Sequence, residues 1–132
     1  MEEKSAATDL FELSALRKAE VLIEALPYIR SLAGKTVVIK YGGNAITDDD
    51  LLGKVMSDIT LLKYVGINAV LVHGGGPDIT AALERAGVKS EFRDGLRVTT
   101  AESIDIIREV VIGNTNARIV SELNARGGKG IG

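Results

Sequence analysis

The stretch that is most informative about fold and function is Ala69-Val70-Leu71-Val72-His73-Gly74-Gly75-Gly76-Pro77. An apolar run with strand character ends at three successive glycines, and a helix-like stretch follows. Glycine has no Cβ, so a ligand can lie directly against the backbone N–H groups of this turn. Because the turn precedes a helix N-terminus, a carboxylate or a phosphate is favoured there. The sequence therefore predicts an anion site, and a tight strand-to-helix turn is the plainer alternative.

The same order of elements occurs once earlier in the chain, around Gly42 and Gly43. The β-branched run 36–40 predicts a strand buried on both faces. The three aspartates 48–50 predict a helix start rather than a metal site, and an apolar stripe from Leu52 to Leu62 follows them. This repeated order is typical of a parallel α/β sheet. Both glycine turns then lie at carboxyl ends of strands, where open α/β sheets bind ligands.

The remaining segments predict four more helices and one hairpin. The helices are expected over residues 9–32, 78–86, 99–112 and 115–123, and the hairpin over residues 88–98. Capping pairs are expected at Asp9 with Glu12 and at Thr99 with Glu102. Pro27 predicts a kink in the first helix, and the Asp94-Gly95 pair predicts the turn of the hairpin.

Composition restricts the class of protein. The 132 residues carry a net charge of −2, no cysteine, and 45% hydrophobic residues. These values fit one globular domain of ordinary size, with no disulfides and no basic cluster that would favour nucleic acid. The acidic start of the chain and the lack of an apolar run of membrane length disfavour a targeting or spanning segment. We expect a cytoplasmic protein that binds neither nucleic acid nor a membrane.

Several catalytic motifs are incomplete. The Gly34-Lys35-Thr36 triplet lacks the earlier glycine of a phosphate-binding P-loop and precedes a strand. The His-Gly-Gly-Gly segment also occurs in esterases, but no Gly-x-Ser-x-Gly elbow is present. The one histidine, His73, is expected to shape the glycine turn rather than to act as a base.

The candidate site residues that remain are Lys40, Gly42, Gly43, the glycines Gly74 to Gly76, and Arg97. A lysine beside exposed N–H groups suits the negative charge that develops on a phosphoryl group in transfer. The guanidinium of Arg97 offers a planar fork that matches a carboxylate, and a structural ion pair is the alternative for this residue. No metal site is expected.

Three segments in this order and spacing resemble the acetylglutamate kinases, which belong to the amino-acid kinase family. They are Lys40-Tyr41-Gly42-Gly43-Asn44-Ala45, His73-Gly74-Gly75-Gly76-Pro77 and Gly95-Leu96-Arg97-Val98-Thr99. The first two are shared more loosely with carbamate kinases and aspartokinases, and the third narrows the choice. The resemblance implies a truncated, amino-acid kinase-like α/β fold: a three-layer sandwich with a mainly parallel sheet, a kinked N-terminal helix and a β-hairpin.

The resemblance also implies an activity and residue roles. The activity is transfer of phosphate from ATP, with Mg²⁺, to the γ-carboxylate of N-acetyl-L-glutamate, a step of arginine biosynthesis. Lys40 would stabilise the transferring phosphoryl group, and Arg97 would bind the substrate α-carboxylate. Gly75 and Gly76 would donate backbone N–H groups to the substrate. Gly42, Gly43 and Gly74 would line the phosphate path.

The resemblance further implies two parts in this chain. Residues 1–34 resemble the N-terminal helical extension of arginine-inhibited acetylglutamate kinases, an oligomerisation arm, and an ordinary packed helix is the alternative. Residues 35–132 resemble the acetylglutamate-binding lobe, and the nucleotide lobe is absent. We therefore expect a homo-oligomer, and no kinase activity from this chain alone.

The sequence differs from the family pattern at two positions, and two alternative functions stay open. Asp78 stands where glutamine is frequent, and Asn114 stands where a lysine often occurs. The alternatives are a related kinase with another acyl or carbamoyl substrate, and a non-catalytic oligomerisation or anion-binding module.

Overall fold

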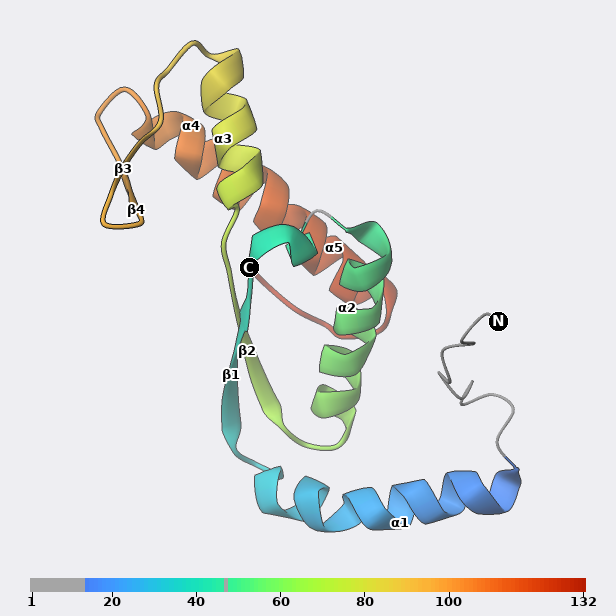
Figure 1. Ribbon diagram of the computed structural model, residues 1–132. Helices are drawn as coiled ribbons and strands as arrows, with labels where there is room; N and C mark the ends of the chain where they lie inside the picture. The colour runs from blue at the N-terminus through green and yellow to red at the C-terminus, as the bar shows by residue number, and fades with distance from the viewer. Residues whose placement is uncertain (1–13, 47) are drawn as a thin grey trace, which may run out of the picture. The chain divides into compact units, whose positions relative to one another are not determined.

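The computed structural model describes residues 14–46 and 48–132 and divides the chain after Ala33 into two compact units (Figure 1). The described part of the first unit is helix α1, and the second unit holds all the other helices and strands described. No helix in these described ranges combines the length and the apolar character needed to cross a membrane.

Helix α1 spans Ala15–Leu32 and begins after Ser14, whose side-chain oxygen accepts a hydrogen bond from the Arg17 N–H. It continues through Pro27, so the kink expected there stays a prediction. The expected capping pair of residues 9 and 12 lies outside the described residues. None of the residues of α1 is buried, although the helix carries several leucines and isoleucines.

The second unit is built on two parallel strands, β1 (Thr36–Tyr41) and β2 (Asn68–His73). The strands pair along their whole length, so that their carboxyl ends, Tyr41 and His73, lie opposite each other. Helix α2 (Asp49–Tyr64) connects them and starts at Asp48, whose carboxylate accepts a hydrogen bond from the Leu51 N–H at 3.0 Å. The predicted parallel α/β arrangement, and the aspartates as a helix start, are confirmed.

Helices α2 and α5 (Ala117–Ala125) pack on one face of this sheet, as Figure 1 shows. The buried side chains of this cluster come from the end of β1, from α2 and from α5, together with Ile46: Tyr41, Ile46, Leu52, Met56, Ile59 and Ile119.

The opposite face of the sheet is exposed. Val38 is 67% exposed, and Val70 and Val72 alternate with half-buried residues along β2. The prediction that the first strand is buried on both faces is therefore wrong for the described residues. The β-branched composition is compatible with either arrangement, and here helices cover only one face.

Helix α3 (Gly76–Arg85) packs against a long helical run made of α4 (Ile104–Arg108), the π-helix η2 (Glu109–Asn116) and α5. The prediction of two separate helices in this run is wrong, because the helical run continues through residue 113. A glycine costs an interior helical position only about 1 kcal/mol, and packing of buried Val110 and Thr115 on either side outweighs that cost.

The hairpin consists of β3 (Glu91–Arg93) and β4 (Leu96–Val98), paired antiparallel. Asp94 and Gly95 have φ values of 50° and 79°, the left-handed conformation that a two-residue hairpin turn requires at both positions. The predicted turn is confirmed.

The capping interaction after the hairpin lies one residue later than expected. The Thr100 N–H donates to the Ser103 hydroxyl at 2.8 Å, and the Ser103 N–H donates to the Thr100 hydroxyl at 3.2 Å. Serine therefore takes the place expected for Glu102. Serine can replace glutamate here because the cap needs only a side-chain oxygen three residues after the capping threonine.

The core packing on α2 predicts unequal effects of two equivalent substitutions. Leu52 is 2% exposed and Leu61 is 60% exposed, and both lie on α2. Leu52→Ala is expected to lower the free energy of unfolding by about 2–5 kcal/mol, because it opens a cavity in the core. Leu61→Ala is expected to change it by less than about 0.5 kcal/mol. Urea unfolding monitored by circular dichroism measures both values, and equal losses would contradict the packing described.

Candidate active site

The two glycine turns lie side by side at the carboxyl end of the sheet. β1 leads into Gly42 and the short helix η1 (Gly43–Ile46), while β2 leads into Gly74 and Gly75 before α3. The Gly74 N–H donates a hydrogen bond to the Tyr41 carbonyl at 3.3 Å, which joins the two turns directly. Figure 1 shows both turns leaving the same end of the strand pair. The sequence-based expectation that they share one edge is confirmed.

The backbone of these turns is open to a ligand. A Cβ built on Gly42, Gly43, Gly74 or Gly76 would meet no atom within 4 Å. Gly43 has a φ of +67°, a conformation that residues with side chains rarely adopt. Within residues 14–46 and 48–132, the N–H groups of Gly75 and Gly76 donate no hydrogen bond. Two adjacent, unused donors at the start of a helix can bind an anion.

Arg97 lies against the first turn of α3. Its Nη2 donates to the Gly76 carbonyl at 3.3 Å and to the Thr80 hydroxyl at 2.7 Å, and its Nη1 donates to the Ser90 hydroxyl. The guanidinium carbon stands 4.7 Å from the centre of the Phe92 ring. These contacts place a half-buried cation beside the triple glycine turn, and its Nε–H takes part in none of them.

Lys40 is the least constrained of the predicted residues. It occupies the last position but one of β1, and its side chain is exposed. By strand alternation it lies on the side of the sheet opposite Tyr41 and the covering helices. In the described part of the chain its ammonium makes no ion pair and no hydrogen bond with the other candidate residues.

His73 is held at both ring nitrogens. Its Nδ1 lies 2.9 Å from the Gly74 carbonyl oxygen, and its Nε2 lies 3.0 Å from the side-chain amide nitrogen of Asn116. This arrangement agrees with the expectation that His73 shapes the glycine turn.

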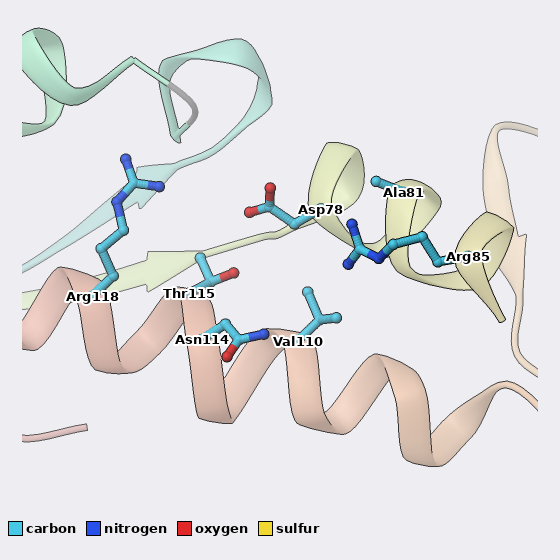
Figure 2. A pocket seen from close by; sticks show the side chains of 7 residues that line it. All are labelled: Asp78, Ala81, Arg85, Val110, Asn114, Thr115 and Arg118. Atoms are coloured by element: carbon cyan, nitrogen blue, oxygen red, sulfur yellow. The ribbon is translucent and has the colours of Figure 1, made fainter.

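A separate cavity of about 240 Å³ lies between α3 and the η2–α5 run, as Figure 2 shows. Side chains from both helices point into it: Asp78, Ala81, Arg85, Val110, Asn114, Thr115 and Arg118. Asp78 and Asn114, the two residues expected to depart from the family pattern, thus line the same space. The α3 residues of the cavity are spaced to lie on the helix face opposite Gly76 and Thr80, so the helix separates the cavity from Arg97.

One charged side chain that lines this cavity, Arg118, is bound by the protein itself. Arg118 donates to the Asp49 carboxylate at 2.6 Å and to the Ile46 carbonyl at 3.0 Å. The buried Thr115 hydroxyl has no hydrogen-bond partner among the described residues, and it lies 3.4 Å from where a Cβ of Gly75 would stand. The cavity therefore reaches the back of the glycine turn.

The pKa of one tyrosine at the sheet edge is raised. Burial raises the pKa of the Tyr41 phenol above its ordinary value of 10.0, while the Arg118 guanidinium acts in the opposite direction and Asp48 adds to the rise. No group of three or more histidine and acidic side chains in the described ranges is placed to hold a metal ion.

The residues that hold Arg97 and His73 were not predicted. The Phe92 contact could have been, because a two-residue turn at 94–95 puts Phe92 directly opposite Arg97. Thr80 and Asn116 carry no local signal, since each contact depends on how distant helices pack.

Comparison with known proteins gives consistent matches. The amino acid kinase family matches residues 35–132. The chain is 56% identical over 119 residues to an acetylglutamate kinase of Caldicellulosiruptor bescii, covering 90% of this chain and 41% of that protein. It is 53% identical over 125 residues to an acetylglutamate kinase of Albidiferax ferrireducens, covering 95% of this chain and 42% of that protein. The chain thus spans about two-fifths of the length of these curated relatives.

A solved structure shares the fold. It is the N-acetylglutamate synthase from Neisseria gonorrhoeae complexed with coenzyme A and N-acetyl-glutamate, with a TM-score of 0.70 and 30% identity. The match covers 82% of this chain and 25% of that one. The parallel strand pair, its two glycine turns and the match over residues 35–132 lead to one conclusion: the chain belongs to the amino acid kinase family.

Proposed function

We propose that this chain carries the acyl-substrate half of a transferase, an N-acetyl-L-glutamate 5-phosphotransferase of arginine biosynthesis in the cytoplasm. The reaction converts ATP and N-acetyl-L-glutamate to ADP and N-acetyl-L-glutamyl 5-phosphate. The curated relatives that match most of this chain are named acetylglutamate kinase, which supports the proposal.

The observation that carries the proposal is the position of Arg97. Its guanidinium is fixed against Gly76 and Thr80, beside two backbone N–H groups that have no partner in the described chain. A planar cation near two adjacent backbone donors suits a ligand that has two separate anionic or carbonyl groups. N-acetyl-L-glutamate has an α-carboxylate, a γ-carboxylate and an acetyl carbonyl.

In this proposal Arg97 binds the α-carboxylate, and the N–H groups of Gly75 and Gly76 bind the other end of the substrate. The acceptor carboxylate oxygen forms a bond to the γ-phosphorus of ATP while the bond from that phosphorus to the β-phosphate oxygen breaks. Charge is only redistributed in this step, so donors that are already positioned can supply much of the stabilisation.

The phosphate side of the proposed site consists of Lys40, Gly42, Gly43 and Gly74. The open space above these glycines fits a phosphate group that approaches the backbone, and the exposed Lys40 side chain has no competing ion pair among the described residues. ATP with Mg²⁺ supplies the phosphoryl group. Lys40 would neutralise charge on the transferring group, and the glycine N–H groups would orient it.

The proposed substrate predicts that binding depends on Arg97. Arg97→Ala is expected to weaken binding of N-acetyl-L-glutamate by about 10- to 100-fold, because hydrogen bonds to charged groups contribute roughly 1.5–3 kcal/mol. Isothermal titration calorimetry on the 132-residue chain measures this change.

Arg93→Ala is the matched control, since Arg93 is exposed on the same hairpin and lies outside the proposed site. It is expected to bind as the unaltered chain does. If Arg97→Ala binds equally well, the substrate lacks the α-carboxylate contact, and a related kinase with another acyl or carbamoyl substrate becomes the better reading.

A second prediction concerns catalysis. The 132-residue chain alone is expected to release no ADP in the presence of ATP and N-acetyl-L-glutamate, because the adenine and ribose contacts are proposed to belong to the remaining three-fifths of the relatives' length. A coupled ADP-release assay checks this, with the chain omitted as the blank. Acetylglutamate-dependent turnover would contradict it.

We also propose that residues 1–34 form an oligomerisation arm and that residues 35–132 form the acetylglutamate-binding lobe. The support is the exposure of the apolar side chains of α1: Leu16 is 72% exposed, and Leu22 and Ile23 are nearly as exposed. Burying a leucine side chain contributes roughly 1.5–3 kcal/mol, so such a face gains stability against a second copy.

Removal of residues 1–34 is therefore expected to reduce the oligomer to a smaller species. Light scattering coupled to size-exclusion chromatography gives the two masses. Leu22→Glu in the 132-residue chain should have the same effect, while Glu24→Gln on the same helix should not. An unchanged number of subunits after both changes to α1 would exclude the arm.

A further inference from the structure

The side chain of Asn116 lies far from the glycine turn in sequence but contacts the histidine that borders it. Asn116 is the last residue of the π-helix η2, and its amide nitrogen is 3.0 Å from His73 Nε2. The roles proposed in substrate binding and phosphoryl transfer use neither side chain. The contact links the long helical run to the turn that bears the two unpartnered N–H groups.

The two contacts of His73 select one tautomer of the ring. A carbonyl oxygen can only accept a hydrogen bond, so the 2.9 Å contact with Gly74 requires a proton on Nδ1. The neutral ring then has a lone pair on Nε2, which accepts the N–H of the Asn116 amide. In the Nε2–H tautomer, the Nε2–H and the Asn116 N–H would point at each other, and Nδ1 would have no proton to donate to the Gly74 carbonyl.

The bond to the Gly74 carbonyl also sets the direction of the next N–H. A trans peptide is planar, so the Gly74 C=O and the Gly75 N–H point to opposite sides of the chain. Fixing the carbonyl on the ring therefore directs the Gly75 N–H away from the ring. Peptides between glycines rotate more freely than any others, so the hydrogen bond from the His73 ring restricts this turn more than it would restrict an ordinary one.

Asn116 stands on a rigid support. Three residues after it, Ile119 is buried among Tyr41, Met56 and Ile59, and the preceding Thr115 is buried against the back of Gly75. Asn116 ends the π-helical segment, and its contact with His73 shows that its side chain faces the end of β2.

We propose that Asn116 is a positioning residue: through the Nδ1–H tautomer of His73, it orients the Gly74–Gly75 peptide so that the Gly75 N–H is directed at the substrate. The proposal rests on the proposed function for the identity of that substrate. It assigns no chemical step to Asn116 or to His73. Donors oriented before the ligand arrives bind it without further loss of conformational entropy.

The test uses Asn116→Asp in the 132-residue chain, a change that keeps the size of the side chain but removes its donor. Asn114→Asp is the matched control, because it makes the same chemical change two residues away in the cavity between α3 and η2. Asn116→Ala is a second variant that removes the donor without adding a charge. Urea unfolding of each variant shows that the fold is kept.

Three readouts separate positioning from a structural role. Long-range ¹H–¹⁵N NMR spectra report the tautomer without ambiguity, because the chain contains one histidine. The Gly75 amide resonance reports the peptide orientation. Calorimetry with N-acetyl-L-glutamate reports binding.

The unaltered chain and Asn114→Asp are expected to show the Nδ1–H tautomer and the same Gly75 resonance. Asn116→Asp is expected to favour a proton on Nε2, because a carboxylate can only accept, and Asn116→Ala is expected to lower the share of the Nδ1–H tautomer, which the Gly74 carbonyl alone then favours. Both variants are expected to shift the Gly75 resonance and to bind about tenfold more weakly, the equivalent of one lost hydrogen bond.

An Nε2–H tautomer in the unaltered chain overturns the proposal, as does undiminished binding by both Asn116 variants. If the tautomer and the Gly75 resonance respond as expected but the unaltered chain does not bind N-acetyl-L-glutamate, the positioning network stands and the proposed substrate is wrong. The same NMR comparison is then repeated with inorganic phosphate, whose binding identifies the anion that the Gly75 N–H receives.

Discussion

The parallel pairing of β1 and β2 extends one hydrogen bond past the strands, where the Gly74 N–H meets the Tyr41 carbonyl. This bond brings the two glycine turns into contact, although helix α2 and strand β2 lie between them in the sequence. The position of α3 follows from it, because α3 starts directly after Gly75. The hairpin position follows in turn, since Arg97 fastens β4 to the first turns of α3 through Gly76 and Thr80. A shift of one residue between the strands would separate the glycine turns and move every later contact.

The helical run from Ile104 to Ala125 unites the two hydrophobic clusters of residues 34–132. Its first part packs on α3 through Val110, and its last part packs on α2 and the sheet through Ile119. The glycine turn lies between these two contacts. The same helical run therefore packs against both the strand pair and α3. These two contacts hold the glycine turn in one conformation while its backbone N–H groups stay open to a ligand.

Much of this arrangement could be predicted because its signals are local. The β-branched runs, the glycine turns and the Asp94-Gly95 turn each follow from a few adjacent residues. The exposed face of the sheet and the π-helix could not, since packing between distant segments decides both of them. The cap is local, but Thr100 and Ser103 form it where Thr99 and Glu102 were expected. The same division applies to the site. The glycines and Arg97 are candidates from their motifs, whereas Thr80 and Asn116 contact the candidate residues Arg97 and His73 across 17 and 43 residues of sequence.

The stacking of Arg97 on Phe92 has a consequence for how an anion would be received. The ring covers one face of the guanidinium at 4.7 Å, so part of its hydration is already removed in the folded protein. A carboxylate approaching the remaining edge would displace less water and would meet a cation whose plane is already set. An ammonium group at this position would carry the same charge, but it would stay fully hydrated and have no plane for the aromatic ring to orient.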